Sequence, residues 1–172
     1  MRFKELLEEQ EVTLIGRKIG PTHKKLFTAE MAGKRWNGNF ICAREGLTTL
    51  EGAPSIIRNG AFDCSTNRLT SLKGIPSSVD GFVNCAANKL TSLHDIHKLI
   101  KNMDGVFWAN SNPITSCILG VLLIRGCIGL MIDNIRVKNI IIKHLPNNYG
   151  FQGVLACQNE LLDAGFDEYA KL

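Results

Sequence analysis

Residues 59–72 read Asn-Gly-Ala-Phe-Asp-Cys-Ser-Thr-Asn-Arg-Leu-Thr-Ser-Leu, and this arrangement returns at a nearly constant interval along the middle of the chain. Counterparts of its last four residues start at Leu47, Leu69, Leu90 and Ile114. These starts lie 22, 21 and 24 residues apart. A period in this range is typical of a solenoid, in which each repeat is one coil that buries its apolar side only against its neighbours. The sequence therefore predicts a solenoid of four coils over residues 37–117.

Alignment of the four coils produces columns of equivalent positions, and two of these columns are apolar. They contain Phe40, Phe62, Val83 and Phe107, and, two residues later, Cys42, Cys64, Cys85 and Ala109. Because the residues between them are mixed, the alternation predicts a short strand with one buried face. An Asn-Gly or Asp-Gly dipeptide precedes each strand, which favours a tight turn with positive φ.

A polar column follows each strand and consists of Glu45, Asn67, Asn88 and Asn112. An asparagine amide can bond to backbone groups where the chain turns a corner, and unpaired buried peptide groups are destabilising. The column therefore predicts a buried asparagine ladder between coils. Beyond the Leu-Thr-Ser-Leu segment, Pro54 and Pro76 predict an extended, non-helical return path.

These columns resemble a short leucine-rich repeat, because Phe62-x-Cys64-x-x-Asn67-x-Leu69 matches the L-x-L-x-x-N-x-L core of that family. The Leu-Thr-Ser-Leu return is similar to the short repeats of bacterial effector proteins, and resembles still more the Cys-containing repeats of large tailed bacteriophages. Residues 1–7 and 161–172 also look like phage versions. The resemblance implies a phage accessory protein that binds, and could inhibit, a bacterial or viral protein. Glu45, Trp108 and Ala109 depart from the pattern, as expected of terminal coils.

The segments on either side of the repeats are expected to cap the solenoid, and the alternative for the C-terminal segment is a small interaction module. Residues 1–36 predict a short N-terminal helix followed by a strand over residues 12–16. Residues 118–172 predict strands over 119–124 and 130–132 and helices over 137–145 and 154–172. The inward side of the last helix is expected to hold Leu155, Leu161, Leu162, Phe166 and Tyr169. The predicted fold class is thus an α+β repeat solenoid of the leucine-rich-repeat type, one folded unit with a cap at each end.

Composition and hydropathy predict one folded domain that is not secreted and does not span a membrane. The chain has 172 residues, which suits one domain, and 45% of them are hydrophobic, which is ample for a core; the formal net charge of +4 is mild. No secretory signal follows Met1, and the apolar run 118–132 is too short to span a membrane and contains Arg125. The expected location is the cytoplasm, that of a bacterial host if the chain is phage-encoded.

The six cysteines do not form a metal-binding pattern. Cys42, Cys64 and Cys85 recur with the repeat, and no C-x-x-C is present. We expect them to be buried thiols that act as small hydrophobes, and we expect no metal and no cofactor. His94 and His97 flank Asp95, but no third ligand can be identified, and a solvated loop is the simpler interpretation.

No catalytic constellation is present, since the sequence contains neither a phosphate-binding glycine loop nor a nucleophile elbow. We therefore expect a non-enzymatic protein. The strands of a solenoid project their outer side chains in parallel, so they present a rigid surface that loses little conformational entropy when a partner binds. The candidate partner-binding residues are Ile41, Asp63, Ser65, Asn84, Trp108 and Asn110. Trp108 is the expected anchor, because large aromatic residues dominate interface energies; the alternative is that it packs under the C-terminal cap.

Two other functions are compatible with the sequence. A basic cluster next to Phe27 and Trp36 could bind nucleic acid, and consists of Arg17, Lys18, Lys24, Lys25, Lys34 and Arg35. The acidic run over residues 5–11 lies nearby and weakens this alternative. A structural or assembly role in a virion is the other alternative. The near-absence of charge in the outer strand column favours a protein partner.

Overall fold

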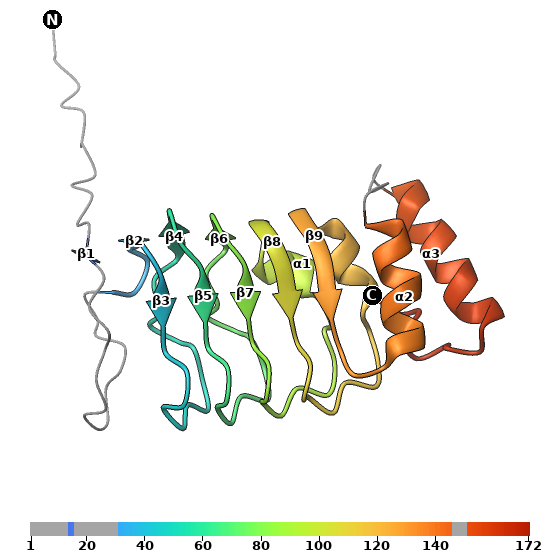
Figure 1. Ribbon diagram of the computed structural model, residues 1–172, viewed down its shortest axis with the longest axis horizontal. Helices are drawn as coiled ribbons and strands as arrows, with labels where there is room; N and C mark the ends of the chain where they lie inside the picture. Colours follow the sequence, from blue (N-terminus) through green and yellow to red (C-terminus); the bar gives the residue numbers. More distant parts are fainter. Residues whose placement is uncertain (1–13, 16–30, 146–150) are drawn as a thin grey trace, which may run out of the picture.

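The fold is a parallel sheet wound into a solenoid of about four turns, with a few helices. The computed structural model describes residues 14–15, 31–145 and 151–172. Within these residues the sheet has nine strands in the order β1-β2-β4-β6-β8-β7-β5-β3, and β9 pairs with β8. The strands lie side by side along the long axis of the molecule, and α2 and α3 lie beyond β9 at one end (Figure 1). The solenoid predicted from the repeat period is therefore confirmed.

Most coils contribute two short strands instead of the single strand that the sequence predicts. In each of these coils one strand precedes the glycine of the Asn-Gly or Asp-Gly dipeptide, and these strands are β2 (Arg35–Asn37), β4 (Ile56–Arg58) and β6 (Ser78–Val79). The strands that follow it are β3 (Phe40–Ile41), β5 (Phe62–Asp63) and β7 (Val83–Asn84). The longer β8 (Asn102–Trp108) pairs with both rows. The expected strand near residues 12–16 is present as β1 (Leu14–Ile15), whereas the predicted N-terminal helix lies outside the described residues.

The predicted apolar columns form the core of the sheet in the expected register. Phe40 pairs with Phe62, Phe62 with Val83, and Val83 with Phe107, and all four are fully buried. The rings of Phe40 and Phe62 stack with their centroids 5.6 Å apart. The cysteine column is buried as well: Cys42, Cys64 and Cys85 are each 0% exposed. Stacking of equivalent residues from coil to coil thus builds one continuous core.

The predicted asparagine ladder is confirmed, and we call Asn67, Asn88 and Asn112 the interior ladder. The Asn88 side-chain amide donates to the carbonyls of Cys64 (3.1 Å) and Cys85 (3.0 Å), and its Oδ1 accepts from the Leu69 N–H (3.0 Å). Asn67 and Asn112 repeat this pattern in the adjacent coils. Each ladder asparagine therefore satisfies backbone groups of two successive coils, which ties the coils together.

Positive φ occurs at three of the four predicted Asn-Gly or Asp-Gly dipeptides, at Gly38, Asn59 and Gly105. It also occurs at the residue before each member of the polar column, which the sequence did not predict. These residues are Arg44, Thr66, Ala87 and Ser111, with φ of 64°, 56°, 54° and 56°. The left-handed turn places the next side chain, an asparagine in three coils, into the interior. Gly60 has a different requirement, because a Cβ at this position would collide with the backbone carbonyl of Gly38 in the preceding coil.

The C-terminal part differs from expectation in one strand. Residues Leu119–Leu123 form the 3-10 helix η1, not a strand, and four of them are buried. The short helix α1 (Ile96–Leu99) lies against η1. The chain then forms β9 (Arg125–Met131), which extends the parallel ladder beyond the fourth coil by pairing with β8. Because an apolar run without alternation suits a buried helix as well as a buried strand, periodicity alone could not separate the two.

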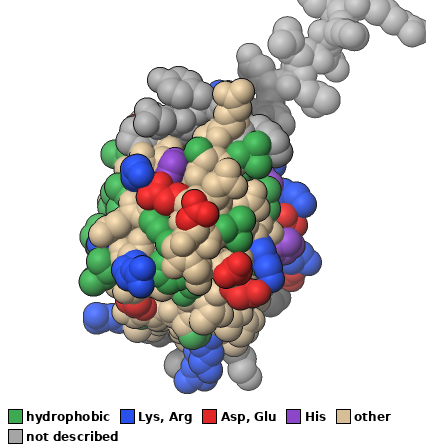
Figure 2. All heavy atoms as spheres, turned by 90° about the vertical axis from the view of Figure 1, so that its right-hand side faces the viewer, with side chains coloured by type: hydrophobic (Ala, Val, Ile, Leu, Met, Phe, Trp, Pro, Cys, Tyr) green, Lys and Arg blue, Asp and Glu red, His purple; other side chains and the backbone are tan. Residues whose placement is uncertain are grey.

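Two helices follow β9, as the sequence predicts. Asn134 caps α2 (Ile135–His144) by accepting from the Val137 N–H (3.1 Å). A carboxylate oxygen of Glu160 on α3 (Phe151–Asp163) accepts from Lys143 Nζ and lies against His144 Nε2, both at 2.8 Å. Hydrophobic side chains lie between charged ones on this end of the molecule (Figure 2).

The predicted inward side of the last helix is partly wrong. Leu161 is fully buried, but Leu155 and Leu162 are 40% and 44% exposed. The helix ends at Asp163, before Gly165 with its φ of 77°, so Phe166 and Tyr169 reach the core from the turns that follow. Three of the five predicted residues, Leu161, Phe166 and Tyr169, therefore face the core, whereas Leu155 and Leu162 do not.

Candidate functional site: the outer face of the strands

The candidate site is the outer face, which we define as the outward side chains of β3, β5, β7 and the end of β8. Ile41, Asp63, Asn84 and Trp108 form one row across these strands, because each is paired in register with the next. Met131 of β9 extends the row beside Trp108. Each of these residues follows a buried residue of the apolar column, so the period of two directs it away from the core.

Trp108 is 40% exposed, and its fully buried neighbour Phe107 fixes the strand beneath it. Its backbone carbonyl accepts from the Cys85 N–H (2.8 Å), which belongs to the preceding coil. The partial exposure places Trp108 on the surface instead of in the core, with the neighbouring strand residues Asn84 and Met131 on either side. A rigid, partly exposed indole of this kind is suited to anchor a protein partner.

The outer face holds a second exposed aromatic residue, Phe82, which the sequence analysis did not select. Phe82 is 45% exposed and precedes the buried Val83. Phe82 directly precedes β7, and the register that pairs Val83 with Phe107 aligns it with Val106, two residues before Trp108 on the neighbouring strand. The residue was missed because its position was assigned to the turn before the strand. The sequence did contain a signal for this exposed residue, because the equivalent positions of the other coils hold Asn39, Ala61 and Val106, and Phe82 is the only aromatic residue in this column.

Asp63 and Asn84, two of the predicted contact residues, also hold the ends of their own strands. Asp63 Oδ1 accepts from the Ser65 N–H (2.9 Å), and Asn84 Oδ1 accepts from the Ala86 N–H (3.1 Å). Bonds of this type stabilise a local turn and fix the side-chain orientation. Both side chains are half-buried, so they present fixed polar groups at the centre of the row.

Asn110, another predicted contact residue, is less accessible than its column suggests. Its Oδ1 is buried and has no hydrogen-bond partner in the described part of the chain. The neighbouring Ser111 N–H is held instead by both carboxylate oxygens of Asp133, at 3.0 and 2.8 Å. Ser65, in the equivalent position of the second coil, is half-buried. Of the six predicted contact residues, only Ile41 and Trp108 are exposed, and the other four are half-buried.

The alternative nucleic-acid site falls largely on residues that the structure does not describe. Arg17, Lys18, Lys24 and Lys25 lie outside the described ranges, whereas Lys34 and Arg35 are exposed at the start of β2. Of the two aromatic residues beside this cluster, Phe27 lies outside the described residues, and Trp36 is 4% exposed, with its Nε1 donating to the Asn39 carbonyl (3.1 Å). Its ring is therefore part of the core and is not presented for base stacking.

The structure places His94 and His97 in different surroundings. His94 is exposed, with Nδ1 2.6 Å from the Leu172 carbonyl oxygen and Nε2 3.5 Å from Asp95. His97 Nδ1 is buried without a partner among the described residues, and burial lowers the pKa of this imidazole. No group of three His, Cys, Asp or Glu side chains in the described ranges is placed to hold a metal ion.

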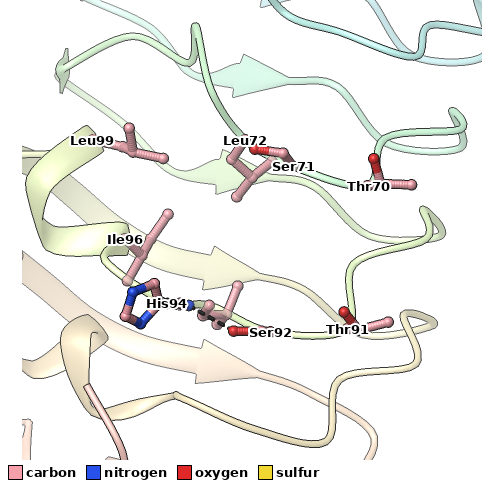
Figure 3. A pocket seen from close by; sticks show the side chains of 9 residues that line it. Thr70, Ser71, Leu72, Thr91, Ser92, His94, Ile96 and Leu99 are labelled. Carbon is pink, nitrogen blue, oxygen red and sulfur yellow. Dashed lines mark hydrogen bonds between the residues drawn. The ribbon is translucent and has the colours of Figure 1, made fainter.

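A shallow groove of about 260 Å³ lies beside His94, between the returns of the second and third coils (Figure 3). Hydroxyl groups of Thr70, Ser71, Thr91 and Ser92 line it together with apolar side chains. The Ser92 hydroxyl accepts from the His94 N–H (2.9 Å) and so serves the backbone turn. The groove lies on the return side of the coils and not on the outer face.

The interior thiols are chemically protected. Burial is the main cause that raises the pKa values of Cys42, Cys64 and Cys85 well above the ordinary value of 9.0. The same cause raises the pKa of Cys157 to about 12. All four remain neutral thiols near pH 7, and a neutral thiol is a poor nucleophile and metal ligand.

Comparisons with protein-family models, with curated proteins and with solved structures found no match for this chain. In the part of the chain that the structure describes, no helix is both long enough and apolar enough to cross a membrane.

Proposed function

We propose that this protein is a non-catalytic scaffold that binds another protein through its outer face. The observation that carries the proposal is the exposure of large apolar side chains on a sheet: Ile41, Phe82 and Trp108 are 46%, 45% and 40% exposed. Exposed apolar groups on a fixed backbone are typical of interaction sites. The interior ladder holds this backbone in place, so little conformational entropy is lost when a partner binds.

The resemblance of the repeats to those of tailed-bacteriophage proteins supports a bacterial or viral protein as the partner. On this proposal the chain acts in the cytoplasm of the bacterial host as a phage accessory protein. Inhibition is one consequence of binding, and an activity assay of the captured partner in the presence of the chain would test it.

The test is a tagged pull-down from bacterial lysate with three versions of the chain: the wild type, Trp108→Glu and Ile135→Glu. Ile135 is the matched control, because it is 64% exposed and lies at the start of α2, outside the row from Ile41 to Trp108. We expect the wild type and Ile135→Glu to retain the same protein after nuclease treatment. Trp108→Glu should lose it, while its melting temperature stays within a few degrees of the wild-type value.

Two results would contradict the proposal. Equal capture by Trp108→Glu and the wild type would show that the outer face is not the binding surface. Loss of all captured protein on nuclease treatment would transfer the site to the basic cluster that includes Lys34 and Arg35. A thermal melt of Trp108→Glu checks that the substitution does not unfold the protein. If the melting temperature falls by more than a few degrees, Trp108→Ser provides a milder variant that removes the same contact.

A further inference from the structure

The outer face, extended to Met131 of β9 and to Asp133, carries two carboxylates and no basic side chain. Along its central row the sequence is Ile41, Asp63, Asn84, Trp108 and Met131. The parallel row two residues later is Ala43, Ser65, Ala86, Asn110 and Asp133. These two rows contain two carboxylates and no lysine or arginine, although the whole chain has a net charge of +4.

The two carboxylates differ in their availability. Both oxygens of Asp133 are engaged by the Ser111 N–H. Asp63 uses Oδ1 for the Ser65 N–H (2.9 Å), and among the described residues no hydrogen bond or ion pair involves its Oδ2. An oriented, half-buried carboxylate with an uncommitted oxygen is a suitable acceptor for an ammonium or guanidinium donor.

Asp63 lies between two exposed apolar side chains. Neighbouring strands are about 4.8 Å apart, so Ile41 is about 5 Å from Asp63 on one side and Trp108 is about 10 Å away on the other. A cation held at Asp63 would therefore lie beside Ile41 on one side, with Trp108 beyond Asn84 on the other. The apolar stem of a lysine or arginine can itself pack along such a surface while its charge reaches a carboxylate.

From this arrangement, and resting on the function proposed above, we infer that the partner contributes a lysine or arginine between two apolar side chains. The cation binds Asp63, and the apolar side chains pack on Ile41 and on Trp108 with Phe82. A helix that crosses the strands would present these groups at positions i, i+4 and i+11, which lie on one helical face at rises of about 6 and 16 Å. The inference thus specifies a basic, apolar polypeptide segment as the occupant.

The chain offers variants that move the charge without disturbing the fold. Asp63→Asn removes the charge but keeps an Oδ1 that can accept from the Ser65 N–H. Asn84→Asp adds a charge one strand closer to Trp108 and keeps the acceptor for the Ala86 N–H. The double variant Asp63→Asn with Asn84→Asp therefore shifts one carboxylate by about 4.8 Å at constant net charge.

The experiment selects a yeast-displayed library of random 20-residue peptides against the wild type, Asp63→Asn and Trp108→Glu. Peptides enriched by the wild type should share a lysine or arginine flanked by apolar residues, and Trp108→Glu should enrich none of them. For a synthetic copy of one enriched peptide, Asp63→Asn should raise the Kd about threefold to tenfold. Replacement of the peptide's basic residue by norleucine should have the same effect, with little further change when the two are combined.

The outcomes separate the inference from the proposed function. The inference would be overturned if the enriched peptides bound the wild type but not Trp108→Glu, and either lacked a basic residue or bound Asp63→Asn equally well. That result would leave the proposed binding function intact. Enrichment that is equal on the wild type and Trp108→Glu, or absent from both, would overturn both. Selection of acidic peptides would contradict the charge argument directly.

Discussion

Asparagine occurs in both the interior ladder and the outer face, and it has a different structural role in each. In the third coil Asn88 belongs to the interior ladder, and Asn84 belongs to the outer face only four residues earlier. Asn88 is 8% exposed and bonds to backbone groups of Leu69, Cys64 and Cys85, in two coils. Asn84 Oδ1 accepts from the Ala86 N–H of its own coil. The difference indicates that the interior ladder fixes the stacking of coils, whereas the outer face is free to carry recognition.

The largest expected effect separates these two asparagines. Asn88→Ala leaves the buried Leu69 N–H unpaired and removes one of the two amide donors from each of the Cys64 and Cys85 carbonyls. It should lower the free energy of unfolding by about 2–4 kcal/mol. Asn84→Ala removes one partly exposed bond and should lower it by less than about 1 kcal/mol. Urea unfolding followed by circular dichroism measures both values.

The control for this comparison is Asn67→Ala, which removes the ladder residue one coil earlier. It should destabilise the protein at least as much as Asn88→Ala, because Asn67 Oδ1 accepts from two N–H groups, those of Glu45 and Leu47. If Asn84→Ala and Asn88→Ala destabilised the protein equally, the ladder bonds would not be what holds the coils together. The predicted difference depends on burial and not on the number of asparagines, so it is specific to this architecture.

A smaller effect is expected from the interior thiols at alkaline pH. Burial raises the pKa values of Cys64 and Cys85 in the folded protein, whereas the unfolded thiols ionise near the ordinary value of 9.0. Above about pH 9 the unfolded chain therefore loses protons that the folded chain keeps, so stability is full below that pH and falls as pH rises. Each such thiol contributes a loss of about 1.4 kcal/mol per pH unit.

The measurement is urea unfolding at pH 8, 9, 10 and 11 for the wild type and Cys85→Ala. The variant should be less stable than the wild type at pH 8, because it leaves a cavity, but its stability should fall less steeply with pH. Identical slopes would show that Cys85 ionises as readily in the folded protein as in the unfolded one. Cys127, whose pKa is also raised, provides a second site for the same comparison.

The repeat made the interior predictable from the sequence. Because each column recurs in several coils, the register of Phe62 with Val83, the burial of Cys64 and the bonds of Asn88 all followed from one alignment. Backbone pairing between coils is a geometric consequence of stacking, so columns report directly on contacts. The exposure of Trp108 followed from the same alternation of inward and outward residues.

The parts that could not be predicted are those where the repeat pattern does not apply. The strand row β2-β4-β6 was hidden because Pro54 and Pro76 precede it, and the sequence indicated only an extended path. The helix η1 replaced a predicted strand because a short apolar run has no distinguishing period. Asp63 was selected for its exposure, but its bond to the Ser65 N–H depends on a rotamer that the alignment does not contain.

The smallest expected effect concerns Thr66, which lies between the outer face and the interior ladder. Its φ of 56° is in the left-handed region, where a β-branched side chain is more strained than asparagine or glycine. The side chain is exposed, so few contacts oppose its replacement. Thr66→Asn should therefore raise the free energy of unfolding by about 0.5–1 kcal/mol. The left-handed turn is what directs Asn67 inward, so relief of its strain should strengthen the interior ladder without altering the outer face.

The matched control is Thr70→Asn, an exposed threonine in the same coil that lacks a positive φ and should show no gain. Urea unfolding again supplies the measurement, and peptide binding by Thr66→Asn should equal that of the wild type. A gain at Thr70 of the same size would assign the effect to asparagine at the surface instead of to the turn. A loss of binding at Thr66 would show that the outer face extends to this turn, and that the two regions share a residue.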